Sequence, residues 1–180
     1  MAKKNVGKIF EGDFSSSVPS DVFIHRLKDS AMSYNKSKST SYTWNNECDF
    51  YMYNGSLFYA IECKSTQSTS MSVELVKDDE KNSKMIKKHQ VDSLRKISEY
   101  KNCIAGLMCN FRKDDKIQVL YFIEINDFLR MMKKIDKKSF NIIDLVQNGA
   151  VRIDGKLKRV HYVWDIESFL NNMNEKYNKV

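Results

Sequence analysis

The pattern of apolar and polar positions divides the chain into helical and extended segments. Aromatic and β-preferring residues flank an Asn-Gly pair at positions 54 and 55, which is the strongest short-range signal for a tight hairpin. Residues 46–66 are therefore predicted to form a two-stranded ribbon. A type I′ turn at this pair sets which residues lie opposite each other, namely Tyr53 and Ser56, Tyr51 and Phe58, Asp49 and Ala60, and Glu47 and Glu62.

The remaining segments predict an α/β protein. Polar runs at 30–46 and 67–82 indicate loops. Helical spacing is found at 5–17, 83–101, 127–134 and 142–148 and after Asp165, and extended patterns at 22–27, 103–111, 117–125 and, as one or two strands, 151–164. This order is typical of a mixed central β-sheet flanked by helices. The length of 180 residues and the hydrophobic content of 42% favour one domain over 1–180.

The predicted hairpin gathers charge on one face. Side chains alternate between the two faces of a strand, so one side of the ribbon carries Glu47, Asp49, Glu62 and Lys64. Opposed like charges destabilise a ladder, and a buried unpaired carboxylate is costly. Lys64 neutralises part of this charge, and a divalent cation with oxygen ligands would neutralise the rest. The alternative is a charged strand face exposed to water.

A glutamine on the second predicted helix points toward this face. With Ser83 as the N-cap, Gln90 lies four residues after Ile86 and four before Leu94, so it shares the apolar stripe of the helix. An inward amide requires a hydrogen-bond partner, which the charged face of the sheet would supply. The alternative is a glutamine at the edge of the stripe.

The charge balance favours an anionic partner. A formal net charge of +7 is typical of a domain that binds nucleic acid. The polar segment 30–46 carries lysines and aromatic residues, and is either a connector or a projection that contacts a nucleic-acid backbone and stacks on bases. A second basic cluster, consisting of Arg152, Lys156, Lys158 and Arg159, is either a solvated face or a phosphate contact.

Several classes of protein are disfavoured. The chain has no run of 18 apolar residues and begins without the apolar core of a signal peptide, which predicts a cytoplasmic protein with no membrane span. Four cysteines without C-x-x-C spacing predict reduced thiols. A zinc site built from Cys48, Cys63 and His89 is an alternative, but unbridged cysteines usually pack in the core.

Hydrolysis of a phosphodiester requires an activated water and stabilisation of the growing negative charge. Asp49 followed by Glu62 and Lys64 forms a D…E-x-K pattern that meets this requirement. Together, the motifs C-D-F…Y-A-I-E-C-K-S-T, K-H-Q-V, G-K-I-F-E and V-R-I-D-G resemble the RecU-type Holliday-junction resolvases, including phage and prophage relatives. These enzymes belong to the PD-(D/E)xK nuclease superfamily, and the resemblance covers most of the chain.

The resemblance implies a restriction-endonuclease-like core and a homodimeric endonuclease that places paired symmetric nicks in a four-way DNA junction during recombination and repair. It implies a Mg²⁺ cofactor, for which Mn²⁺ can substitute, and metal ligands at Asp49, Glu62, Gln90 and Glu47. It gives Lys64 the transition-state role and makes Glu11 a further catalytic candidate. Residues 30–46 correspond to the projecting stalk of the family, and the predicted DNA contacts are Lys36, Lys38, Tyr42, Trp44 and His89.

Two other functions are left open. One is a PD-(D/E)xK nuclease of another specificity, such as a restriction or branched-DNA repair enzyme. The other is a non-catalytic DNA-binding accessory protein on a decayed nuclease fold, against which the complete set of Asp49, Glu62 and Lys64 argues. Other recombination proteins are further candidate partners.

Overall fold

A six-stranded mixed sheet lies at the centre of the computed structural model, which describes residues 5–28, 46–75, 84–114 and 116–178. Its strands, in spatial order, are β1 (Phe23–Arg26), β2 (Phe50–Tyr53), β3 (Phe58–Thr66), β5 (Cys103–Arg112), β6 (Gln118–Glu124) and β8 (Val151–Ile153). Strands β3 and β5 run parallel, whereas the other neighbours are antiparallel. The predicted mixed α/β class is therefore confirmed.

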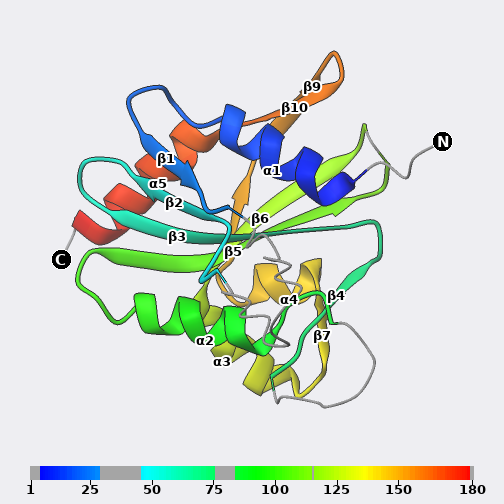
Figure 1. The fold of residues 1–180 in the computed structure, drawn as a ribbon. Coiled ribbons are helices and arrows are strands. Elements are labelled where there is room, and N and C mark those ends of the chain that lie inside the picture. The colour runs from blue at the N-terminus through cyan, green and yellow to red at the C-terminus, as the bar shows by residue number, and fades with distance from the viewer. Residues whose placement is uncertain (1–4, 29–45, 76–83, 115, 179–180) are drawn as a thin grey trace, which may run out of the picture.

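Helices cover both faces of this sheet (Figure 1). One face packs against α1 (Val6–Ser16) and α5 (Ile166–Asn178), and the other against α2 (Lys88–Ile97), α3 (Ile125–Ile135) and α4 (Ile142–Gln147). Because side chains alternate along a strand, Ile61 enters the first core and Ala60 the second. Within the described ranges, no helix combines the length and apolarity that crossing a membrane requires.

Two short ribbons lie outside the central sheet. Strand β4 (Ser70–Ser72) pairs with β7 (Ser139–Asn141), and β9 (Gly155–Lys158) pairs with β10 (His161–Trp164). The predicted loop over 67–82 is wrong at β4, and 151–164 holds three strands rather than one or two. The β4–β7 pairing joins distant parts of the chain and buries Met71 opposite Phe140, so local composition does not reveal it.

The register of the β2–β3 hairpin differs by two residues from the predicted one. Tyr53 lies opposite Phe58, and Phe50 opposite Ile61. The predicted opposition of Tyr53 to Ser56, Tyr51 to Phe58, Asp49 to Ala60 and Glu47 to Glu62 is therefore wrong. A shift of two residues nevertheless keeps the side chains of β2 and β3 on their predicted faces, because the faces alternate with period two. Before Phe50 the pairing is irregular: the backbone N–H of Asp49 donates to the carbonyl oxygen of Ile61 at 3.1 Å, and Cys48 packs in the core on the other face from Phe50.

A four-residue loop, in place of the predicted two-residue turn, causes this shift. Asn54 accepts hydrogen bonds through Oδ1 from the backbone N–H groups of Ser56 and Leu57, at 3.1 and 2.9 Å. Gly55 has a φ of 92°, whereas Asn54 lacks the positive φ that a type I′ turn requires at both central residues. The Asn54 side chain therefore competes with the tight turn by bonding within its own loop.

Helix α2 is shorter at both ends than predicted. It begins at Lys88 with Lys87 as the N-cap, and the predicted cap, Ser83, lies outside the described residues. Ile86, predicted as the first apolar position of the helix, instead forms a parallel bridge with Val73 and is fully buried. A β-bridge thus takes the place of the first predicted helical turn.

Candidate active site

Glu62 on β3 is the centre of the candidate site. Its side chain is 2% exposed, and its Oε1 accepts hydrogen bonds from Lys64 Nζ, at 2.6 Å, and from Gln90 Nε2. Lys64 shares the face of Glu62 because the two residues are two positions apart on one strand. The alternative of a charged strand face exposed to water is excluded at Glu62.

Asp49 lies just before β2, and its carboxylate is close to that of Glu62. Its Oδ2 accepts a hydrogen bond of 2.8 Å from the backbone N–H of Cys63. Burial raises the pKa of Asp49, while the Cys63 hydrogen bond and the Lys64 charge lower it. The bond to the neighbouring strand therefore orients this carboxylate beyond the end of β2.

The positive charge of Lys64 acts on both the Asp49 and the Glu62 carboxylates. Burial raises the pKa of Glu62 from 4.5 to about 7, the charge of Lys64 opposes this rise, and the Asp49 carboxylate adds to it. A buried acid with a strongly raised pKa beside a second acid is common at functional sites. A cation between the carboxylates would relieve their repulsion.

Gln90 of α2 points toward the sheet, as predicted. Its Nε2 donates to Glu62, and its Oε1 accepts a hydrogen bond of 3.0 Å from the backbone N–H of Lys87. The amide oxygen of Gln90 thus accepts a hydrogen bond at the N-terminus of α2, and its amide nitrogen donates one to the Glu62 carboxylate. In this orientation Gln90 positions Glu62, and its role as a metal ligand stays a prediction.

Glu11 of α1 and Arg26 of β1 lie beside Asp49. Nε and Nη2 of Arg26 contact the Oε2 atom of Glu11 at 2.8 and 2.7 Å. The charge of Glu11 raises the pKa of Asp49, and that of Arg26 lowers it. The catalytic role of Glu11 stays a prediction. Arg26 was not predicted to belong to the site. The local sequence indicates it only as a cationic residue within the alternating segment 22–27.

Glu47 is exposed and is a hydrogen-bond partner of Tyr51. The Tyr51 hydroxyl donates a hydrogen bond of 2.5 Å to the Glu47 carboxylate. Burial, followed by this hydrogen bond, raises the pKa of Tyr51. The proposed role of Glu47 as a metal ligand stays a prediction.

The predicted DNA-contacting residues fall into two groups. His89, in the first turn of α2, is exposed, and partial burial of its ring and the nearby Lys87 lower its pKa. The other four, Lys36, Lys38, Tyr42 and Trp44, lie outside the described residues. Their contacts with DNA stay predictions.

The described residues that flank positions 29–45 lie beside Asp49. Asn46 Nδ2 donates a hydrogen bond of 2.5 Å to the backbone oxygen of Lys28. The Leu27 N–H donates to the backbone oxygen of Asp49 at 2.9 Å. Lys28 and Asn46, between which the predicted DNA contacts fall in the sequence, are therefore next to the candidate site.

The four cysteines are free thiols, which confirms the prediction for them. Cys48 and Cys63 belong to the cores on opposite faces of the sheet. Burial raises the pKa of Cys48 to about 12 and that of Cys63 well above its ordinary value. The described part of the chain brings together no three His, Cys, Asp or Glu side chains able to hold a metal. The alternative of a zinc site at Cys48, Cys63 and His89 is therefore wrong.

The carboxylate pair fits Mg²⁺ in its usual mode of binding. Asp49 uses Oδ2 and Glu62 uses Oε1 for the contacts above, which leaves Oδ1 and Oε2 outside those bonds. Mg²⁺ is commonly held by one or two carboxylates and completes its shell with water and substrate phosphates. A third protein carboxylate is therefore not required.

The raised pKa of Glu62 predicts how the metal-free protein responds to pH. Because the folded pKa of about 7 lies above the ordinary 4.5, the folded state binds this proton more tightly than the unfolded chain. The free energy of unfolding should therefore fall as the pH rises between these values, by up to about 3 kcal/mol from this residue. Denaturant unfolding in EDTA across this range measures the effect, which Glu62→Gln should lack.

Added Mg²⁺ should oppose the loss of stability at higher pH, since a metal ion displaces the proton from its ligand. It should raise the unfolding midpoint of the wild-type protein more at about pH 8 than at about pH 6. Identical pH profiles for the wild-type protein and Glu62→Gln, with and without Mg²⁺, would contradict the assignment.

No protein-family model matches the chain, whereas comparisons with known proteins and solved structures find similar chains. The chain is 27% identical over 190 residues to the SPbeta prophage-derived uncharacterized protein YotM of Bacillus subtilis (strain 168), covering 98% of this chain and 90% of that protein. Among solved structures it is similar to Hjc of Archaeoglobus fulgidus, a Holliday junction resolvase from an archaeal hyperthermophile. That similarity has a TM-score of 0.48 and 12% identity and covers 81% of this chain and 93% of the other.

Proposed function

We propose that the protein is a Mg²⁺-dependent endonuclease of the PD-(D/E)xK type that resolves Holliday junctions by paired symmetric nicks. The observation that carries this proposal is the buried Glu62, bonded to Lys64 and Gln90 and next to the Asp49 carboxylate. A buried acid beside a half-buried one, with a single lysine, has little structural value but suits metal-assisted hydrolysis of a phosphodiester.

Each residue of the site has a distinct task. Asp49 and Glu62 would hold Mg²⁺, which when bound supplies Lewis acidity and lowers the pKa of a water ligand. Lys64, with its side chain 16% exposed, is placed to stabilise the negative charge that develops on the phosphate. Gln90 keeps Glu62 oriented through its amide nitrogen.

Branched DNA as the substrate is supported by charge and by position. The net charge of +7 favours binding to a phosphate backbone. The residues 29–45 have a sequence that suits contact with DNA, and the described residues that flank them, Lys28 and Asn46, lie beside Asp49. Paired nicks in a two-fold symmetric junction need two equivalent active sites, which a homodimer supplies.

The setting proposed is the cytoplasm of a bacterium. The similarity to a prophage-derived protein of Bacillus subtilis supports a phage or prophage relative of the RecU-type resolvases. Mn²⁺ should substitute for Mg²⁺ because both accept oxygen ligands, and other recombination proteins are candidate partners.

Cleavage of three DNA substrates under one Mg²⁺ concentration tests the proposal. A mobile four-way junction, a flap and a linear duplex are compared, and the nick positions are mapped on every strand. We expect symmetric paired nicks in the junction and little product from the duplex. Equal cleavage of all three would favour a nuclease of another specificity. Binding without any metal-dependent product would favour the non-catalytic alternative.

A further inference from the structure

The β9–β10 hairpin is a ribbon fixed to α1, and Figure 1 shows it projecting beyond that helix. Trp164 covers Gly155 so closely that a Cβ there would lie 2.4 Å from the indole ring. Asp13 of α1 lies 2.9 Å from Nδ1 of His161 and accepts a hydrogen bond of 3.0 Å from the backbone N–H of Tyr162. The base of the hairpin is therefore anchored, and its position relative to the sheet is defined.

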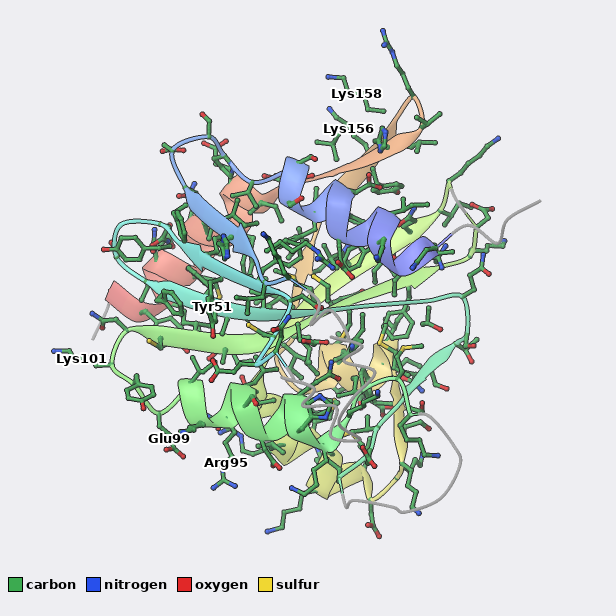
Figure 2. All side chains as sticks on the ribbon, viewed as in Figure 1. Tyr51, Arg95, Glu99, Lys101, Lys156 and Lys158 are labelled. Atoms are coloured by element: carbon green, nitrogen blue, oxygen red, sulfur yellow. The ribbon has the colours of Figure 1, made fainter. Side chains whose placement is uncertain are left out.

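The pairing of β9 with β10 turns two lysines outward. Lys156 lies opposite Val163 and Lys158 opposite His161, whereas the intervening residue of β9 faces the buried Tyr162. All four residues of β9 are exposed. Figure 2 shows Lys156 and Lys158 on the hairpin, well away from α2 and α3. A phosphate backbone can therefore reach both lysines.

Among the residues that the structure describes, three cations of this hairpin have no acidic partner. Arg152, on the preceding strand, is paired with Asp154 at 3.0 Å. Lys156, Lys158 and Arg159 make no ion pair with any of the residues that the structure describes. The tip of the hairpin thus carries positive charge that is not neutralised by the described protein surface.

A cavity of about 200 Å³ lies beside the tip of the hairpin. It lies between α1 and the ends of β5 and β6, and its charged lining comes from Arg112, Lys116 and Arg159, with Asp13 as the acidic residue. Arg112 is 7% exposed, and its Nε donates a hydrogen bond of 2.8 Å to Ser65. Ser65 in turn donates to Asn110 at 2.7 Å, so a buried network fixes the guanidinium in the wall of the cavity.

We propose that the β9–β10 hairpin and this cavity form a second DNA-binding site, which holds the phosphodiester backbone of a duplex arm. This inference rests on the proposed function for its choice of ligand. It adds a contact outside the Asp49–Glu62 site and outside the segment 29–45. Phosphate contacts position a protein on a duplex without reading its sequence. The hairpin therefore orients the arm whose strand is cut.

The cavity and the Asp49–Glu62 site lie on opposite faces of the sheet. Lys64 lies opposite Cys109 on the parallel strand β5, and Arg112 follows three residues later, so the two side chains point to opposite faces. From the rise and spacing of strands, the Cα atoms of Lys64 and Arg112 are about 11 Å apart. The cavity would therefore hold a part of the junction that does not contact the scissile bond.

Neutralising the hairpin tests the proposal. The variant combines Lys156→Gln, Lys158→Gln and Arg159→Asn, because Arg159 has a φ of 61° and asparagine tolerates this conformation. Binding of a labelled four-way junction is followed by fluorescence anisotropy in EDTA at several salt concentrations. We expect affinity at low salt to fall about tenfold or more, and the slope of log K against log salt to decrease by about 2 to 3.

A second triple variant controls for net charge. Arg95→Gln, Lys96→Gln and Lys101→Gln also remove three positive charges, but from exposed positions in and after α2 (Figure 2). Arg95 and Lys101 lie far from the hairpin in that view, and this variant should bind nearly as the wild-type protein does. Equal losses in both variants, or unchanged binding by the hairpin variant, would overturn the proposal. Thermal unfolding of each variant verifies that the fold is kept.

Cleavage by the same proteins separates this inference from the proposed function. If the wild-type protein binds through the hairpin but yields no Mg²⁺-dependent product, the nuclease proposal fails and the hairpin site stands. If the wild-type protein cleaves and the hairpin variant binds normally, the hairpin site fails and the nuclease proposal stands. Inorganic phosphate that fills the cavity without competing with DNA would also overturn the hairpin site.

Discussion

Replacement of Asp49 by Asn or of Glu62 by Gln is expected to abolish Mg²⁺-dependent cleavage of a four-way junction, lowering the rate by at least about a thousandfold. Each change removes a negative ligand from the proposed metal site and keeps the shape of the side chain. In Asp49→Asn, the remaining amide oxygen can still accept the Cys63 hydrogen bond. Single-turnover cleavage measures the rate, and anisotropy in EDTA should show junction binding close to that of the wild-type protein.

Two further carboxylates provide matched controls for this result. Glu99, exposed after the end of α2 and labelled in Figure 2, should tolerate substitution by Gln without loss of activity. Glu47→Gln tests whether the exposed partner of Tyr51 also holds the metal. A loss equal to that of Asp49→Asn would extend the site to Glu47. Full activity of both Asp49→Asn and Glu62→Gln would refute the active-site assignment.

Replacement of Lys64 by Met should lower cleavage by about a hundred- to a thousandfold while junction binding is largely kept. The lysine is the nearest cation to Glu62, at 2.6 Å, and the proposed source of charge stabilisation in the transition state. Met keeps the length and apolar stem of the side chain and removes only the charge. Lys64→Arg should retain part of the activity, because the cation is kept at an altered geometry.

The same substitution should also change stability, which separates an electrostatic role from a loss of fold. Without Lys64, the buried Glu62 loses its cationic partner, so the pKa of Glu62 should rise further. The metal-free Lys64→Met protein should therefore be less stable than the wild-type protein at about pH 8, and Glu62→Gln in the same chain should restore stability. Wild-type cleavage by Lys64→Met would contradict its assigned role.

Several features of the site follow from local periodicity and were therefore predictable. Glu62 and Lys64 share a face because they are two residues apart on a strand, and the predicted pairing of the two strands brings Asp49 close to them. The error of two residues in the hairpin therefore left the site intact. Gln90 pointed toward the sheet because its spacing from Leu94 holds even though α2 begins later than predicted.

Other features arise only where distant segments meet. The ion pair of Glu11 with Arg26 joins α1 to β1, and the β4–β7 ribbon joins residues far apart in the chain. The basic residues of β9 were visible in the sequence, but their separation from acidic partners depends on how the hairpin packs against α1. No local pattern encodes these contacts, because they depend on the packing of whole elements.

The β2–β3 hairpin shows which features of the site depend on the sequence alone and which depend on tertiary structure. The sequence alone determined that Glu62 and Lys64 share one face, since side-chain direction within a strand depends on residue parity. Tertiary structure decided that Glu62 is buried, because β3 is paired on both sides and α2 brings Gln90 over it. It also decided how Asp49 is oriented, through the backbone N–H of Cys63. Burial removes water from the carboxylates and raises the pKa of each, and this turns a charged strand face into a candidate metal site.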